Sequence, residues 1–402
     1  MYGFYFFQWK FIFNFTMIQK TLDINISESS GSYQIEIGSD LLINCGSWAQ
    51  KSLAASTKKI ALVSNAKVFR LYGEKVEKSL KHSGFEVFNF LMKDGERYKN
   101  LRVLESVLEF LSANKITRSD AVIALGGGVV GDLAGFASAI FLRGIPFLQI
   151  PTTLLAMIDS SVGGKTAVNS AFGKNLIGAF HQPAGVLVDP ETLKTLQKRE
   201  LTAGFCEAVK QGAIADKKLF DQTAHFLKEF TLKNFKNQFS DNKFMRNLEN
   251  LIAAQIAFKA EIVANDEREN VFRTDAKSRK ILNFGHTVAH ALEKITDYKY
   301  FKHGEAVGYG VLAAGELAKN VGILDKDTLQ LLNHVVSSAG NLPPTDKIKV
   351  GKVIEAFEFD KKSSGSNLQW VLLKAIGKPV IFDGNNIPLQ ILHKSLKTVL
   401  NK

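Results

Sequence analysis

Three histidines and a glutamate in the second half of the chain carry side chains that bind divalent metals. His286 and His290 stand four residues apart in NFGHTVAH, a spacing that places both on one face of a helix. His303 opens HGEAVGYG, and Glu207 precedes Lys210 by three residues in GFCEAVKQG. Zn²⁺ accepts imidazole nitrogen and carboxylate oxygen, and three protein ligands leave a position open for substrate. A metal site is therefore possible, although the separations along the chain match no local metal signature and ordinary surface or core histidines are the alternative.

A glycine-rich turn in the first half has the form of a phosphate cradle. The strand-like AVIAL runs into GGGVVGD, and LAGFASAIF follows with helical spacing. Free N–H groups and the positive end of the helix dipole at such a junction favour a bound pyrophosphate. The spacing departs from the GxGxxG dinucleotide signature, so a tight turn is the alternative. In that case Asp132 is only a carboxylate favoured by the dipole in the first helical turn.

Two further polar segments follow this turn. Thr152 and Thr153 close the next expected strand, at the carboxyl edge of the sheet where α/β proteins bind ligands, although threonines there are often only caps. DSSVGGKT resembles a truncated P-loop, but Asp159 stands where GxxxxGK[ST] requires glycine. The segment is instead a glycine-rich turn that carries Lys165, with Lys174 nine residues on, and it is suited to holding an anion.

The elements that must position these residues change character along the chain. Short β-branched runs alternate with helix-length segments in the first half, which predicts βαβ units around a parallel sheet; the expected strands are 59–63, 85–90, 121–125, 146–151 and 185–189, and the expected helices are 68–82 and 101–114. Long helical periodicities follow, over 200–215, 248–265, 281–294, 304–319 and 327–339. We therefore expect an α/β domain over residues 17–190 and an all-α domain over residues 191–402.

Length and composition agree with two domains. The 402 residues exceed one typical domain of roughly 100–200. The net charge of +12 favours anionic partners, whether nucleic acid, a membrane surface or phosphorylated metabolites. For Phe230–Asn250, rich in Lys, Asn and Phe, we favour a solvated amphipathic helix or insertion over a nucleic-acid patch. Cys45 and Cys206 cannot form a disulfide framework, so a reducing cytoplasm is expected.

The first sixteen residues, MYGFYFFQWKFIFNFT, are aromatic and apolar but are interrupted by Lys10. The apolar stretches are far shorter than the roughly 20 residues that span a bilayer, and a secretory signal would order its parts differently. Met17 opens an alternating, strand-like run. We therefore expect residues 1–16 to be an extension outside the core: either translation really begins at Met17, or these residues form a disordered or loosely docked tail.

Several long motifs, in order, make the chain similar to the 3-dehydroquinate synthases, the shikimate-pathway members of the sugar phosphate cyclases. The motifs are DGERYK (94–99), GGGVVGDLAGF (126–136), RGIPFLQIPTTLLAMIDSSVGGKTAVN (143–169), GKNLIGAFHQP (173–183), EAVKQG (207–212), LNFGHTVAHALE (282–293), HGEAV (303–307) and DKK (360–362). The resemblance implies a Rossmann-like NAD domain followed by a helical metal-binding domain, with the site in the cleft between them. It also implies a cytoplasmic homodimer with no nucleic-acid or membrane partner.

The resemblance assigns roles residue by residue. Zinc or cobalt ligands fall on Glu207, His286 and His303, which leaves His290 to hold substrate. NAD contacts fall on Asp94, Glu96, Lys99, Gly128, Asp132, Thr152, Thr153, Lys165, Lys174, Thr192 and Thr195. Substrate contacts fall on Asp159, Lys165, Lys210, Lys259, Arg279, Asn283, His290 and one or both of Lys361 and Lys362, with Arg143 reaching a neighbouring subunit's phosphate site. This basic set suits a substrate with both carboxylate and phosphate groups.

The reaction implied is the conversion of DAHP (3-deoxy-D-arabino-heptulosonate 7-phosphate) to 3-dehydroquinate and phosphate. It passes through transient oxidation by NAD⁺, phosphate elimination, re-reduction, ring opening and an intramolecular aldol closure. The segment between Lys259 and His286 is longer than the family usually has, so Arg279 is assigned by its distance from His286, with Arg273 as the alternative. Rival functions are a valiolone or inosose cyclase, a metal- and NAD-dependent polyol dehydrogenase that releases NADH, and a basic nucleic-acid-binding protein.

Overall fold

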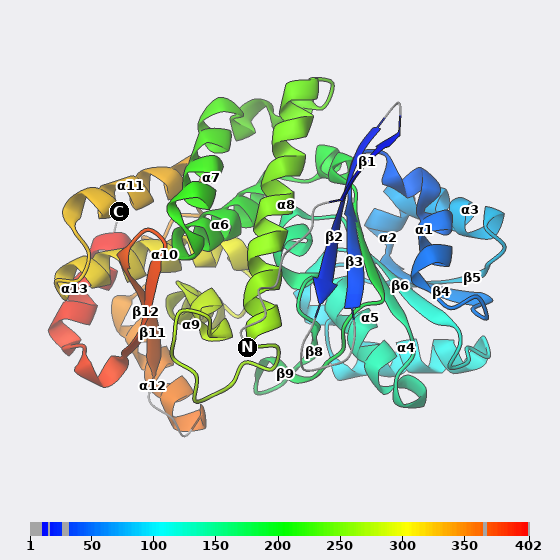
Figure 1. Cartoon of the computed structure of the whole chain (residues 1–402). Helices are drawn as coiled ribbons and strands as arrows, with labels where there is room; N and C mark the ends of the chain where they lie inside the picture. The colour runs from blue at the N-terminus through cyan, green and yellow to red at the C-terminus, as the bar shows by residue number, and fades with distance from the viewer. Residues whose placement is uncertain (1–9, 15–16, 26–31, 365–367, 401–402) are drawn as a thin grey trace, which may run out of the picture. The chain divides into compact units, whose positions relative to one another are not determined.

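The computed structural model describes residues 10–14, 17–25, 32–364 and 368–400, and it describes no side chains for residues 10–19 and 358–364. The chain divides into two compact units, Met1–Thr195 and Leu196–Lys402 (Figure 1). The change of character seen in the sequence at Pro190 falls at the start of a short helix, η6 (Pro190–Thr195), the last element of the first unit. No described helix has the length and apolar character needed to cross a membrane.

The first unit is built on a sheet with the strand order β1-β2-β3-β10-β7-β6-β4-β5. Its strands are β1 (Lys10–Asn14), β2 (Met17–Asn25), β3 (Ser32–Ile37), β4 (Lys59–Asn65), β5 (Glu86–Met92), β6 (Ala121–Gly126), β7 (Phe147–Pro151) and β10 (Gly185–Val188). From β3 to β5 all neighbours are parallel, whereas β1, β2 and β3 pair antiparallel. Of the sixteen-residue extension, the structure thus describes one edge strand, β1.

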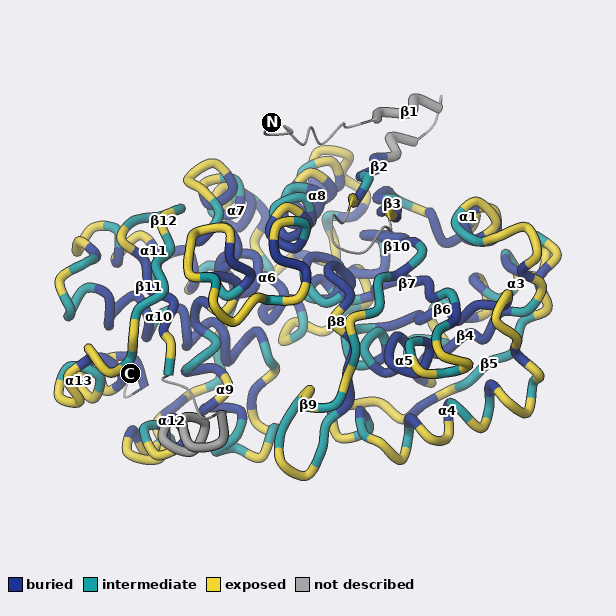
Figure 2. The backbone as a smooth tube through the Cα atoms, turned by 60° about the horizontal axis from the view of Figure 1, so that its bottom comes forward, coloured by how far each residue is buried: buried dark blue, intermediate teal, exposed yellow. Residues whose placement is uncertain are grey.

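Helices cover both faces of the parallel sheet. They are α1 (Cys45–Ser52), α2 (Ala66–Val68), α3 (Glu74–His82), α4 (Leu101–Ala113) and α5 (Gly128–Ile140), with the short helices η1 (Leu41–Asn44), η2 (Phe69–Gly73), η3 (Glu96–Tyr98), η4 (Phe141–Arg143) and η5 (Ala156–Ser160). Ile60 and Leu62 of β4 pack with α1 and α3, whereas Ala61 and Val63 pack with α4 and α5. Alternate residues of a buried strand therefore pack into two separate cores, one on each face of the sheet. Figure 2 shows the buried strands beneath helices whose outer sides are exposed.

The expected parallel strands are present, each within a few residues of its expected bounds. Because they are parallel, their carboxyl ends meet at one edge, which carries the glycine turn and Thr152. A separate hairpin, β8 (Lys165–Ser170) with β9 (Gly173–Phe180), was not expected from the sequence. It places Lys165 and Lys174 on two paired strands rather than in one loop.

The second unit is helical. Its helices are α6 (Lys198–Ala215), α7 (Lys217–Glu229), α8 (Asn242–Asn265), α9 (His286–Ile295), α10 (His303–Asn320), α11 (Lys326–Ser338), α12 (Val350–Ser364) and α13 (Leu389–Leu400), with short helices η7 (Leu232–Gln238), η8 (Arg279–Asn283) and η9 (Gly384–Asn386). Helix α10 packs against α6, α9, α11 and α13. The expectation of an all-α domain needs one correction, because β11 (Gln369–Ala375) and β12 (Lys378–Asp383) form a hairpin whose Leu372 and Leu373 are buried.

The Lys-, Asn- and Phe-rich segment contributes to the core of this unit. Phe230, Phe235, Phe239 and Phe244 are buried, and their rings pack edge to face. Aromatic pairs of this kind add roughly 0.5–1.5 kcal/mol each beyond the area they bury. The segment is therefore amphipathic: its phenylalanines are buried, whereas Lys233, Lys236 and Lys243 are exposed, and the short helix η7 interrupts it.

Candidate functional site

Three side chains in the second unit meet closely enough to share one metal ion. Glu207 of α6, His286 of α9 and His303 of α10 each offer a ligand atom, and these atoms lie within 4.8 Å of one another. His286 is the first residue of α9 and His303 the first of α10, so both imidazoles come from helix starts. The packing of α10 against both α6 and α9 brings the three residues together although 96 positions separate Glu207 from His303 along the chain.

Each of the two imidazoles has a polar contact at its Nδ1 atom. His286 Nδ1 lies 3.4 Å from the backbone carbonyl oxygen of Phe284, and His303 Nδ1 lies 3.2 Å from Glu293 Oε2. Burial lowers the pKa of His286 well below its usual value, and the nearby Lys210, His303 and His290 lower it further. A neutral imidazole is the form that donates a lone pair to a metal.

Glu207 supplies the anionic ligand of this set. Its side chain is fully buried and forms an ion pair through Oε1 with Lys210, whose Nζ also donates a hydrogen bond of 2.8 Å to the carbonyl of Leu282. Its Oε2 accepts no hydrogen bond from the residues that the structure describes. A buried carboxylate oxygen without a donor is costly unless a cation occupies the position. The residues present therefore fit a divalent ion with two nitrogen ligands and one oxygen ligand.

The expected substrate residues of this unit surround the three ligands in different ways. His290 is exposed, and its ring centroid lies 5.4 Å from that of His286 and 6.1 Å from that of His303. Lys210 and Lys259 are buried, and Asn283 is exposed at the end of η8. The sequence also suggested His286 and His290 as a pair of ligands. The structure instead groups the ligand atoms of His286 with those of Glu207 and His303.

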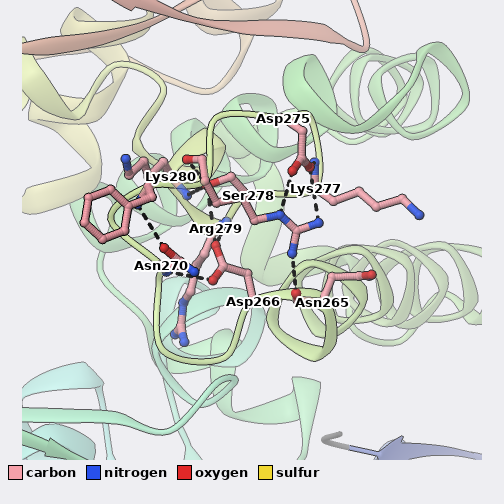
Figure 3. Close-up of polar contacts among 10 residues, drawn as sticks. Asn265, Asp266, Asn270, Asp275, Lys277, Ser278, Arg279 and Lys280 are labelled. Carbon is pink, nitrogen blue, oxygen red and sulfur yellow. Dashed lines mark hydrogen bonds and ion pairs between the residues drawn. The ribbon is translucent and has the colours of Figure 1, made fainter. Parts of the chain in front are cut away.

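The long segment that made Arg279 uncertain is organised by Asp266. Its Oδ1 accepts a hydrogen bond of 2.7 Å from the backbone N–H of Asn270, and its Oδ2 accepts one of 2.7 Å from the backbone N–H of Arg279 (Figure 3). The hydroxyl of Ser278 donates to the same Oδ2 at 3.4 Å. Asp266, directly after α8, therefore holds the far end of the long loop beside it, and Arg279 begins η8 at that point.

The two arginines of this segment have different surroundings. Arg279 is 2 % exposed, and its Nη1 donates to the carbonyl of Glu267. Arg273 is bound within the loop itself, because its Nε donates to Asp275 Oδ2 at 2.7 Å. Asn283 Nδ2 donates to Glu269 Oε1 at 3.1 Å. The DERE motif at 266–269 therefore contacts both Arg279 and Asn283.

An Asp266→Ala variant is expected to lower the free energy of unfolding by about 1–3 kcal/mol, because the buried N–H of Arg279 loses its acceptor. Urea unfolding of the metal-free protein measures this. The matched control is Asp275→Ala, which removes an exposed carboxylate of the same loop and is expected to change stability by less than about 1 kcal/mol. Equal losses in the two variants would show that Asp266 does not organise the segment.

A second polar cluster lies in the first unit. The Lys99 ammonium is 2.8 Å from Asp132 Oδ2, 2.6 Å from Asn175 Oδ1 and 3.5 Å from Glu96 Oε1. Burial alone would lower the pKa of Lys99, but the carboxylates of Asp132 and Glu96 outweigh it and raise that pKa. Lys174 reaches the same Glu96 oxygen at 3.9 Å. Four of the expected NAD contacts therefore meet in one charged network.

This network corrects the simple interpretation of Asp132. Helix α5 starts at Gly128, so Asp132 lies beyond its first turn and contacts Lys99. The glycine turn itself is a strand-to-helix junction, with β6 ending at Gly126. In the first turn of α5 the N–H groups of Val130 and Gly131 donate to the carbonyl of Gly127, which leaves those of Gly128 and Val129 for a pyrophosphate.

The expected threonines divide into two groups. Thr152 is buried and its hydroxyl has no partner among the described residues, whereas Thr153 accepts the N–H of Ala156 at 3.1 Å and acts as a cap. The hydroxyl of Tyr72 donates a hydrogen bond of 2.9 Å to the backbone carbonyl of Thr192, and it lies 2.5 Å from the hydroxyl of Thr195. These two threonines follow β10 rather than joining the Lys99 network.

The remaining expected residues occupy varied positions. Asp94 Oδ1 accepts a hydrogen bond of 3.5 Å from Asn65 Nδ2. Asp159 is the last residue but one of the short helix η5. Lys165 is exposed at the start of β8. Arg143 is exposed and lies in the left-handed region at φ 68°. The side chains of Lys361 and Lys362 lie outside the described residues.

Comparisons with known proteins decide the family. Residues 89–203 match the 3-dehydroquinate synthase N-terminal domain, and residues 204–363 match the 3-dehydroquinate synthase C-terminal domain. A 3-dehydroquinate synthase of Nostoc punctiforme is 40 % identical over 377 residues, which cover 93 % of this chain and 98 % of the relative. The chain belongs to the 3-dehydroquinate synthase family.

Solved structures share the fold of this 3-dehydroquinate synthase family member. A 2-epi-5-epi-valiolone synthase from Streptomyces hygroscopicus, with NAD⁺ and Zn²⁺ bound, is 24 % identical at a TM-score of 0.79 and covers 93 % of this chain and 98 % of its own. A 2-deoxy-scyllo-inosose synthase, complexed with carbaglucose-6-phosphate, NAD⁺ and Co²⁺, is 23 % identical at a TM-score of 0.77 and covers 94 % and 100 %. At such identities the likeness concerns the fold.

Membership of the 3-dehydroquinate synthase family confirms the resemblance carried by the motifs. It confirms the class of fold and an enzyme of the 3-dehydroquinate synthase family. Sequence reasoning missed Glu293, Asp266, Asn175 and Tyr72. Of these, Glu293 alone had a local signal, because it stands on the helix face of His286 and His290.

Proposed function

We propose that this family member converts DAHP to 3-dehydroquinate and inorganic phosphate, and that the residues above divide the work as follows. The observation that carries the assignment is the convergence of Glu207, His286 and His303 within 4.8 Å in a chain matched along both family domains. When bound, NAD⁺ supplies a transient hydride acceptor for the C5 alcohol, and the metal supplies a Lewis acid that acidifies this alcohol.

Glu207, His286 and His303 hold the divalent ion. The fully buried carboxylate contributes one negative charge, and the lowered pKa of His286 keeps that ligand neutral near pH 7. Lys210 contacts both Glu207 and the Leu282 carbonyl, so its ammonium would have a defined position beside an ion held by Glu207. Its charge there favours an alkoxide over an alcohol on a neighbouring substrate oxygen.

The first unit holds the coenzyme. Asp94, Glu96, Lys99, Gly128, Asp132, Thr152, Thr153, Lys165, Lys174, Thr192 and Thr195 are the proposed contacts. The N-terminus of α5 favours a pyrophosphate, and the unpartnered hydroxyl of Thr152 is the sort of buried group that a bound ligand satisfies. The Lys99 network supports this region as a charged, preorganised surface.

The basic residues bind the two anionic ends of the substrate. The proposed contacts are Asp159, Lys165, Lys210, Lys259, Arg279, Asn283, His290, Lys361 and Lys362. For the long loop we favour Arg279 over Arg273, because Arg273 is engaged by Asp275 within the loop whereas Arg279 begins η8, four residues before Asn283. Elimination, ring opening and aldol closure need a held conformation more than a strong base, so these contacts act mainly by positioning.

We further propose a homodimer that works in the cytoplasm. Arg143 is exposed and held in a left-handed conformation beside Leu142, which is 42 % exposed, an arrangement suited to a side chain that serves a neighbouring subunit. Both cysteines are buried free thiols, which agrees with a reducing compartment.

The test supplies purified protein with DAHP, NAD⁺ and Zn²⁺ and measures phosphate and 3-dehydroquinate. We expect both products in equal amounts with no net NADH, loss of turnover after chelation, and recovery when zinc or cobalt is added back. Accumulating NADH would instead indicate a polyol dehydrogenase. Turnover of a different sugar phosphate in place of DAHP would indicate another cyclase.

A further inference from the structure

Glu293 is a buried carboxylate that contacts a metal-ligand candidate without belonging to the ligand set. It is 1 % exposed, near the end of α9, and its Oε2 lies 3.2 Å from His303 Nδ1 on α10. It follows His286 by seven residues and His290 by three, so the three side chains share one face over two helical turns. One face of α9 thus contributes a ligand and a contact to the next ligand.

The contact determines which nitrogen of His303 binds metal. A carboxylate accepts a hydrogen bond and donates none when ionised, so Nδ1 of the ring carries the proton and Nε2 keeps the lone pair. Such a carboxylate also makes the imidazole a stronger donor to a metal. His286 has a weaker equivalent, because its Nδ1 faces a neutral backbone carbonyl at 3.4 Å.

The backbone around His303 is fixed by a different carboxylate. Glu305 is fully buried, accepts two hydrogen bonds of 2.7 Å and 2.6 Å from the Arg199 guanidinium, and accepts the N–H of Lys302 at 2.8 Å. This bidentate pair anchors the first turn of α10. The Glu293 contact acts on the ring of His303 rather than on its backbone.

We propose that Glu293 is a positioning residue that sets the tautomer, orientation and donor strength of His303 and thereby the affinity of the site for zinc. The inference rests on the proposed metal site. It predicts that the two imidazole ligands are unequal, with His303 the stronger donor.

The experiment measures zinc affinity of the purified full chain by competition with a coloured chelator. Glu293→Gln keeps the size of the side chain and removes its charge, and we expect zinc to bind about 10–100-fold more weakly. The matched control is Glu316→Gln, which alters a carboxylate on α10 that is 8 % exposed and paired with Lys319 at 2.6 Å, away from the ligands. That variant should bind zinc within twofold of the unaltered protein.

Two readouts separate positioning from a merely structural role. The visible spectrum of the Co²⁺-loaded protein should shift in Glu293→Gln and stay unchanged in Glu316→Gln, because only the first alters a ligand's donor strength. Thermal unfolding of the metal-free proteins reports stability alone. Unchanged zinc affinity and Co²⁺ spectrum in folded Glu293→Gln would overturn the inference and leave the proposed function intact. Failure of the unaltered chain to bind zinc would overturn both.

Discussion

A His286→Ala variant is expected to lose its metal and its turnover together. The substitution removes one of two nitrogen ligands and leaves Glu207 and His303, too few to close a zinc site. The loss of zinc affinity should exceed the roughly 10–100-fold that follows loss of a hydrogen bond to a ligand. Metal content after dialysis and phosphate release from DAHP measure the two effects on one sample.

His290→Ala is the matched control because it removes an imidazole one turn along the same helix face. Its exposed ring belongs to the proposed substrate contacts rather than to the ligands. We therefore expect this variant to retain zinc while turnover falls. A His286→Ala protein that keeps full activity without metal would refute the ligand assignment, and loss of zinc in His290→Ala instead would exchange the two roles.

The fold was predictable where one rule of periodicity operated over a whole element. The buried strand β4 alternates between two cores, and long helices such as α10 repeat their apolar positions, so both were expected near their true bounds. The β11–β12 hairpin was missed because it is a single pair within a helical unit, and its burial depends on α10 rather than on a local pattern. The mutual contacts of the phenylalanines around η7 could not be predicted, because they come from separate turns of chain.

The site was likewise predictable only where its residues lie on one element. Spacing alone indicated His286 and His290 as a pair, but a helix face says nothing of partners on other helices. The set of Glu207, His286 and His303 required the family resemblance, because the packing of three helices creates it. Asp266 had no sequence signal at all, since its role depends on a loop that returns to α8.

Close backbone approach explains how the three ligand-bearing helices come together. A Cβ on Gly304, the residue after His303, would lie 2.0 Å from the carbonyl oxygen of Ala203 on α6. A Cβ on Gly310 would lie 1.9 Å from the carbonyl oxygen of Gly285, the residue before His286. Only glycine allows α10 to approach both neighbours this closely. The three proposed ligands are therefore brought together by glycines that are not themselves ligands.

A Gly310→Ala variant is accordingly expected to lose about 3 kcal/mol or more of unfolding free energy, at or above the upper end of ordinary overpacking. The clash is with backbone, and Gly285 is itself fixed at φ 79°, so no side chain can move aside. Relief requires α10 to shift from the start of α9, which separates His303 from His286. Zinc affinity should therefore fall in whatever fraction of the protein stays folded.

Gly351→Ala separates this effect from the general effect of adding a methyl group to a helix. Gly351 is exposed in the first turn of α12, and a Cβ there meets nothing within 4 Å. Alanine at such a position stabilises by roughly 0.5–1 kcal/mol, because it restricts the unfolded chain. Urea unfolding of the metal-free variants gives the stability difference, and chelator competition gives zinc affinity. If Gly310→Ala matched Gly351→Ala in both measurements, close helix approach would not be what assembles the ligands.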